Sequence, residues 1–104
     1  MPLIKVASLS QIPADSVTEV TVGGEPYALC NVGGRITALC GTCLHRGGPL
    51  GQGTLDGDYV VCPWHGWEWN SQTGANDMDP AQRVATYAVE VRGDDILLDV
   101  PERA

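Results

Sequence analysis

The chain has 104 residues, of which 43% are hydrophobic, and it carries 13 acidic against 6 basic side chains, for a net charge of −7. This length allows one domain with its own core but no second catalytic module, and the composition is that of a globular protein, neither disordered nor membrane-embedded. The acidic balance argues against nucleic acid as a partner, because binding phosphates requires a basic surface.

Short strand patterns run along most of the chain. The expected strands cover residues 16–22, 27–30, 35–39, 58–61, 86–91 and 96–100. Gly33-Gly34 and Gly93-Asp94 each separate two of these segments, and such pairs are typical of tight hairpin turns. No stretch of ten or more residues keeps a helical period with caps. The pattern predicts an all-β fold, an antiparallel sandwich or barrel.

The middle of the chain, from about residue 41 to 74, has a different composition. It contains eight glycines and two prolines, and its one clear strand pattern leads directly into Cys62. A segment so rich in glycine buries little apolar surface by itself and needs something else to order it. We therefore expect a bound metal centre to organise this segment.

Two Cys-His pairs lie in this segment and include both histidines of the chain. Cys43 and His45 form a C-x-H pair, and Cys62 and His65 form a C-x2-H pair. Two thiolates with two imidazoles suit zinc, or an iron–sulfur cluster with nitrogen ligands on one iron. Cys40 offers an alternative, because C-x2-C-x18-C-x2-H is close to zinc-ribbon spacing but leaves His45 unused.

The residues around the two Cys-His pairs favour these pairs as the ligands over the set that includes Cys40. Cys40 ends an apolar, strand-like run, where a buried free cysteine is unremarkable. Gly47 and Gly66 follow the two histidines within two residues, which indicates matching roles for the two pairs. Three tryptophans crowd the second pair, which a zinc ribbon does not need. They are Trp64, Trp67 and Trp69.

The segments Cys43-Leu44-His45-Arg46-Gly47 and Cys62-Pro63-Trp64-His65-Gly66-Trp67 resemble the two boxes of Rieske [2Fe–2S] proteins. The resemblance continues through Gly53–Gly57 to Gly93–Asp95. It implies one Rieske-type [2Fe–2S] cluster, with Cys43 and Cys62 on the inner iron and His45 and His65 on the outer iron. It also implies a single Rieske domain over residues 1–104, an antiparallel β-sandwich with a Gly-rich cluster-binding subdomain whose loops span about 41–74.

Departures from the high-potential Rieske pattern indicate a low reduction potential. High-potential members of the family carry a disulfide between the boxes and a Ser and a Tyr that donate to the cluster. At the matching positions this chain has Gly48, Trp64, Trp67 and Trp69. Fewer hydrogen bonds to the sulfurs stabilise the oxidised cluster, so we expect a value near the low end of the range, about −150 mV.

Two features of enzymes are missing from the sequence, a third histidine for a mononuclear iron and a dinucleotide-binding loop. Rieske oxygenases also hold a mononuclear iron through two histidines and a carboxylate, and no third histidine is present. No G-x-G-x-x-G loop precedes a helix pattern, so we do not expect the chain to take hydride from NAD(P)H. It is therefore expected to carry electrons without being an enzyme.

The resemblance implies a soluble one-electron carrier with two protein partners, an NAD(P)H-dependent ferredoxin reductase and a terminal oxygenase acting on an aromatic or similar apolar substrate. We expect no signal peptide, no membrane association, a cytoplasmic location and a monomer. Two alternatives remain at this point. The chain could be the small subunit of an assimilatory nitrite reductase, or a structural zinc module for protein interaction.

The tryptophans and a later turn admit more than one role. Trp69 is expected to pack, whereas Trp64 and Trp67 could either pack under the loops or form an apolar rim for a partner. Asp77, Asp79 and Pro80 match a loop that covers the cluster in the family, and a surface turn explains them equally well.

Overall fold

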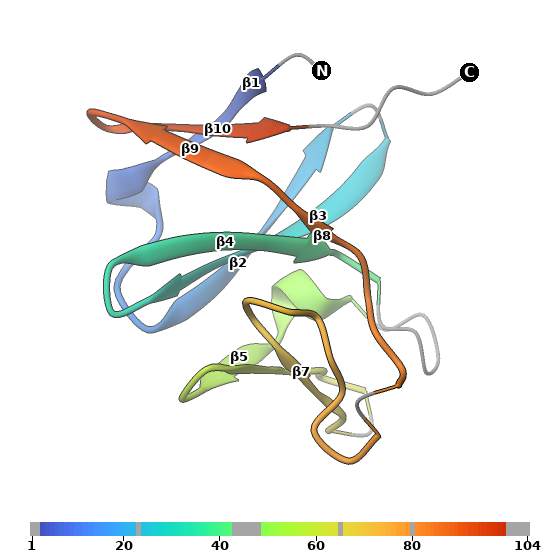
Figure 1. The fold of residues 1–104 in the computed structure, drawn as a ribbon. Coiled ribbons are helices and arrows are strands. Elements are labelled where there is room, and N and C mark those ends of the chain that lie inside the picture. Colours follow the sequence, from blue (N-terminus) through green and yellow to red (C-terminus); the bar gives the residue numbers. More distant parts are fainter. Residues whose placement is uncertain (1–2, 23, 43–48, 65, 80, 100–104) are drawn as a thin grey trace.

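The computed structural model describes residues 3–22, 24–42, 49–64, 66–79 and 81–99. Three antiparallel sheets account for most of this part of the chain (Figure 1). The outer sheet has the order β1-β10-β9, from β1 (Leu3–Ser8), β10 (Asp95–Asp99) and β9 (Val89–Arg92). The central sheet has the order β2-β3-β4-β8, from β2 (Ser16–Val22), β3 (Glu25–Val32), β4 (Arg35–Cys40) and β8 (Thr86–Tyr87). The third sheet has the order β5-β6-β7, from β5 (Thr54–Asp56), β6 (Tyr59–Val61) and β7 (Glu68–Asn70). The expected all-β fold is confirmed.

The helical elements among the described residues are two 3-10 turns, η1 (Leu9–Gln11) and η2 (Leu50–Gln52). In the described part of the chain, no helix is long and apolar enough to cross a membrane.

The central sheet is buried on both faces, which makes the molecule three-layered. Side chains alternate along a strand, so neighbouring residues of β3 point to opposite sides. Tyr27 and Leu29 pack with Ile96 and Leu98 of the outer sheet. From the other face, Ala28, Cys30 and Leu39 pack against Leu50, Val60 and Trp69 of the glycine-rich segment. This second core fixes the position of the β5–β7 sheet.

The strand expected over residues 86–91 is in fact two strands in different sheets. β8 pairs with β4, with Thr86 opposite Leu39, and β9 pairs with β10. Between them, the Ala88 carbonyl accepts a hydrogen bond from the Asp99 backbone N–H at 3.0 Å. The alternating pattern continues across the break because both sheets face the same core, so the change of partner leaves no mark in the sequence.

Three strands were missed by the sequence patterns. β5 and β7 have three residues each, which is too short to show a period of two. β1 is mostly exposed and is specified by its pairing with β10. The glycine-rich segment therefore holds a small sheet of its own, where one strand was expected.

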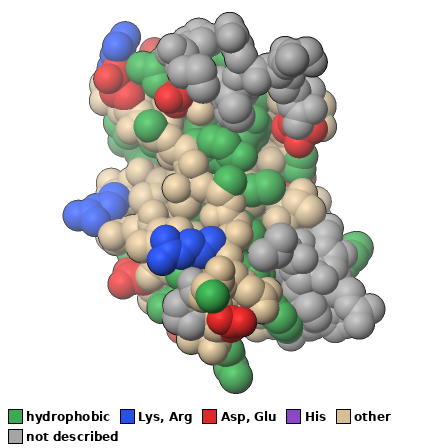
Figure 2. All heavy atoms as spheres, turned by 45° about the vertical axis from the view of Figure 1, so that its right-hand side comes forward, with side chains coloured by type: hydrophobic (Ala, Val, Ile, Leu, Met, Phe, Trp, Pro, Cys, Tyr) green, Lys and Arg blue, Asp and Glu red, His purple; other side chains and the backbone are tan. Residues whose placement is uncertain are grey.

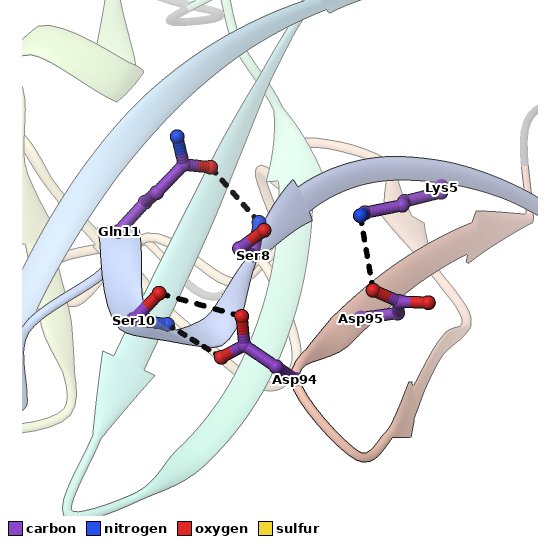
Figure 3. Close-up of polar contacts among 6 residues, drawn as sticks. All are labelled: Lys5, Ser8, Ser10, Gln11, Asp94 and Asp95. Atoms are coloured by element: carbon purple, nitrogen blue, oxygen red, sulfur yellow. Dashed lines mark hydrogen bonds and ion pairs between the residues drawn. The ribbon is translucent and has the colours of Figure 1, made fainter.

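Polar contacts fasten η1 to the β9–β10 turn (Figure 3). The Asp94 carboxylate accepts hydrogen bonds from the Ser10 backbone N–H at 3.0 Å and from the Ser10 hydroxyl at 3.4 Å. Gln11 Oε1 accepts from the Ser8 N–H at 2.9 Å, and the Lys5 ammonium pairs with Asp95 at 3.0 Å. The ion pair is exposed and contributes little, so the strand pairing and the two serine contacts hold the N-terminal strand in place.

Gly53 is required by a close approach of two backbones. A Cβ at this position would lie 2.0 Å from the Val61 carbonyl oxygen, one residue before Cys62. We predict that Gly53→Ala lowers the free energy of unfolding by about 1–3 kcal/mol, because a backbone carbonyl must shift to make room. Urea unfolding followed by circular dichroism measures the change.

The matched control is Gly57→Asn. Gly57 has φ +60 with open space around its Cβ position, and Asn tolerates that backbone conformation. A near-neutral Gly57→Asn beside a destabilised Gly53→Ala is expected. Equal stability of the Gly53→Ala protein and the wild type would contradict the close approach.

Candidate metal centre

Backbone pairing joins the two ends of the loop that carries the first Cys-His pair. The Gly41 N–H donates to the Pro26 carbonyl at 3.0 Å, and the Leu50 N–H donates to the Gly41 carbonyl at 2.9 Å. Thr42 and Pro49 form an isolated antiparallel bridge. Cys43 and His45, predicted as ligands, lie between these two residues and outside the described part of the chain.

A backbone hydrogen bond also joins the two ends of the loop that carries the second Cys-His pair. Cys62 directly follows β6, and its backbone N–H donates to the Trp67 carbonyl at 2.8 Å. Cys62 is 1% exposed, whereas Trp64 is 50% exposed. Gly66 has φ +72, a conformation that glycine adopts without strain. His65 lies outside the described residues.

The bases of the two loops meet in one core. Leu50, which ends the first loop, and Cys62, which begins the second, both belong to the cluster formed with β3 and β4. The Gly53 N–H donates to the Leu50 carbonyl at 3.0 Å, and Thr54 is paired with Val61. The segment that follows the first loop therefore lies beside β6, the strand that leads into the second loop. This arrangement suits a group bound by both loops.

The cysteine side chains outside the two pairs do not have the character of ligands. Cys30 is fully buried in β3, and loss of hydration raises the pKa of its thiol to about 11. The thiol therefore stays protonated. Cys40 is the last residue of β4, is paired with Tyr27 and packs against the core cluster. Its position fits the structural role expected for it.

The three tryptophans differ in how far their side chains are exposed to solvent. Trp69 is fully buried in β7, which confirms that it packs. The Trp67 ring lies 6.0 Å from the Trp69 ring, tilted by 33°, and is partly exposed. Trp64 stands half in solvent. Trp67 thus both packs and reaches the surface, while Trp64 has the exposure expected of a contact residue.

Asn76 is a structural residue that the sequence patterns did not single out. It is 3% exposed, and its Oδ1 accepts hydrogen bonds from the backbone N–H groups of Met78 at 3.0 Å and Asp79 at 2.9 Å. Its Nδ2 donates to the Glu68 carbonyl at 3.2 Å. Asparagine commonly bonds the backbone two residues ahead, and that was the available signal. These bonds hold the 76–79 turn against β7, beside the second loop.

The pKa of Glu68 is raised. Partial loss of hydration is the main cause, followed by repulsion from Asp77 and then Asp56. Ionised Glu68 is therefore disfavoured in the folded protein relative to the unfolded chain. The carboxylates beside the second loop repel one another.

Comparison with known proteins identifies the family. Residues 3–88 match the family model described as "Rieske [2Fe-2S] domain". The ferredoxin component of biphenyl 2,3-dioxygenase from Rhodococcus jostii (strain RHA1) is 34% identical over 101 residues, which are 96% of this chain and 94% of that protein. Ferredoxin CarAc from Metapseudomonas resinovorans is 35% identical over 91 residues, 86% of this chain and 85% of that protein.

A solved structure agrees with this match. It is described as a complex of reduced oxygenase and oxidized ferredoxin in carbazole 1,9a-dioxygenase, and one of its chains superimposes with a TM-score of 0.83 at 33% identity. The superposition covers 92% of this chain and 91% of that chain. The chain belongs to the Rieske [2Fe–2S] family. Its cofactor is therefore one Rieske-type cluster, which decides against the zinc interpretation.

The raised pKa of Glu68 predicts a pH-dependent stability difference. A raised pKa means that stability is lost as the pH rises and Glu68 ionises. Glu68→Gln removes this repulsion, so the variant should melt above the wild type at neutral pH and level with it in acid. Thermal melts across this pH range measure the gap, with Asp15→Asn as a remote control of equal charge. A gap that is constant with pH would contradict the assignment.

Proposed function

We propose that this chain is the ferredoxin component of an aromatic-ring dioxygenase system. It carries one electron at a time from an NAD(P)H-dependent reductase to a terminal oxygenase, and it is not itself catalytic. The observation that carries this proposal is the match, over nearly the whole chain, to a protein named as the ferredoxin component of biphenyl 2,3-dioxygenase. A structurally similar ferredoxin is described in complex with its oxygenase, which supports the same role. Both comparisons favour a mobile carrier over a nitrite reductase subunit.

The four predicted ligands complete the proposal. Cys43 and Cys62 hold the inner iron as thiolates, and His45 and His65 hold the outer iron through ring nitrogens. The buried position of Cys62 at the end of β6 supports this assignment, since a thiolate bound to iron is shielded there from water and competing thiols. The shared core of the two loop bases supports ligation from both loops. Residues 1–104 form a single Rieske domain, with the cluster loops at about 41–74.

The bound cluster supplies a site that accepts and releases one electron. The protein's part is to keep one side of that site dry and to bring the other side to a partner. Trp69 and Val60 fill the core around Cys62, while Trp64, directly before His65, stands half exposed. An exposed aromatic beside a ligand provides contact area at low entropic cost when a partner docks. We place the protein in the cytoplasm as a monomer, where the reductase and the oxygenase reach it by diffusion.

The replacement of the hydrogen-bond donors predicts a low potential. Trp67 occupies a position where high-potential Rieske proteins have a hydroxyl donor, and its ring packs on Trp69. We expect a midpoint potential of about −150 mV, near the low end of the Rieske range. A redox titration followed by EPR measures it. A strongly positive midpoint would contradict the argument from missing donors.

Two variants separate the ligand set from the zinc-ribbon alternative. His45→Ala should abolish the Rieske EPR signal, because the outer iron loses one of its two imidazoles. Cys40→Ala should retain the signal, because Cys40 belongs to β4 and its neighbours are the core. Iron, acid-labile sulfide and the EPR spectrum of the reduced proteins are measured together. Loss of the signal in the Cys40 variant with retention in the His45 variant would contradict the proposed ligands.

A further inference from the structure

A surface groove lies beside the second cluster loop. It has a volume of about 360 Å³ and lies between that loop and the 76–79 turn. Gly66, Trp67 and Met78 give it apolar surface. Its lining also includes three acidic residues, Glu68, Asp77 and Asp79. The groove thus combines an aromatic ring with carboxylates, two features that attract a cationic side chain.

Negative charge predominates around the groove, and the basic residue nearest to it in the sequence is Arg83, whose backbone pairs with Ala75 beside the 76–79 turn. Between Arg46 and Arg83 the chain contains five carboxylates and no Lys or Arg. The ion pairs Lys5–Asp95 and Arg92–Glu90 both belong to the outer sheet, on the far side of the central sheet. Loss of hydration raises the pKa of Glu68, and repulsion from Asp77 and Asp56 adds to this, as expected where carboxylates lie close together.

The groove is held in shape by the fold. Asn76 is buried between the turn and β7, and the Asp77 N–H donates to the Glu68 carbonyl at 3.2 Å. Asp79 accepts hydrogen bonds from the Ala81 N–H and from Gln82 Nε2, which are neutral donors and leave its charge in place. A binding surface that is already ordered loses less entropy when a partner docks.

Two large apolar side chains stand well out of the surface, Met78 in the groove lining and Trp64 on the second loop outside that lining. Met78 is 87% exposed and Trp64 is 50% exposed, the two most exposed of the large hydrophobic side chains in the described part of the chain. Figure 2 shows hydrophobic side chains and an acidic one at the surface of the lower end of the molecule, where Figure 1 places the β5–β7 sheet, with basic side chains above them. Exposed methionine beside charge is common at protein-docking surfaces.

We propose that this groove receives an arginine or lysine side chain of the protein that accepts the electron, and so orients the cluster loops toward that protein. The proposal rests on the proposed function and adds the chemistry of the partner's contact. The cation lies over the Trp67 ring, between the carboxylates of Glu68, Asp77 and Asp79, and Met78 covers its aliphatic stem. A partner with an acidic contact surface would be repelled.

The test uses a basic haem protein, ferricytochrome c, as the electron acceptor. The reduced holoprotein gives one electron to the ferric haem iron, and stopped-flow absorbance follows the haem at several ionic strengths. The groove variant is Asp77→Asn/Asp79→Asn. The control, Asp15→Asn/Asp94→Asn, removes the same charge far from the groove and keeps one side-chain oxygen at each position for the backbone N–H groups of Gly33 and Ser10. The midpoint potential of each protein is measured as well, so that a change in driving force is recognised.

At low ionic strength the groove variant should react about three- to tenfold more slowly than the wild type, and the difference should vanish at high salt. The control should stay within about twofold of the wild type, as expected for distant, screened charges. Equal rates for the wild type and the groove variant, or equal losses in the groove and control variants, would overturn the proposal. The Rieske EPR signal of all three proteins reports on the proposed function separately. Its absence would refute that function, whereas its presence with equal rates would refute the groove alone.

Discussion

The packing of the glycine-rich segment on the second face of the central sheet is the interaction on which the site depends. Leu50, Val60 and Trp69 are fully buried there against β3 and β4. Each such side chain contributes about 1.5–3 kcal/mol when it is buried, which is large beside the weak propensities of three-residue strands. Because Leu50 and Cys62 flank the two loops, the same packing that stabilises the β5–β7 sheet also brings the loops together. Without it, a segment with so many glycines would have no fixed shape.

The same packing makes the site asymmetric. Cys62 points into the core, whereas Trp64, two residues later, is half exposed. This difference suits a carrier, whose cluster must be protected on one side and accessible on the other. The carboxylates of the β5–β7 region belong to a stretch between Arg46 and Arg83 that contains no Lys or Arg. In this account, hydrophobic packing orders the cluster loops and electrostatics guides the partner.

The sequence predicted the fold class and the hairpin strands, because alternation and glycine turns are local signals. The ligand pairs stay a prediction from the Cys-His spacing. It did not predict the split between β8 and β9, since the change of sheet at Ala88 depends on which strands lie nearby. The strands β5 and β7 are specified by the core beneath them and not by their own three residues. The role of Asn76 and the groove both arise from a turn folding back on β7, a contact that no local pattern encodes.

We propose that two histidines and two cysteines hold one [2Fe–2S] cluster between the packed loops. Pulsed EPR of the dithionite-reduced protein tests it most directly, because the method detects nitrogen nuclei bound to the paramagnetic iron. Two coupled histidine nitrogens are expected in the wild type. A reduced cluster without coupled histidine nitrogens, or a colourless protein that contains zinc, would contradict it.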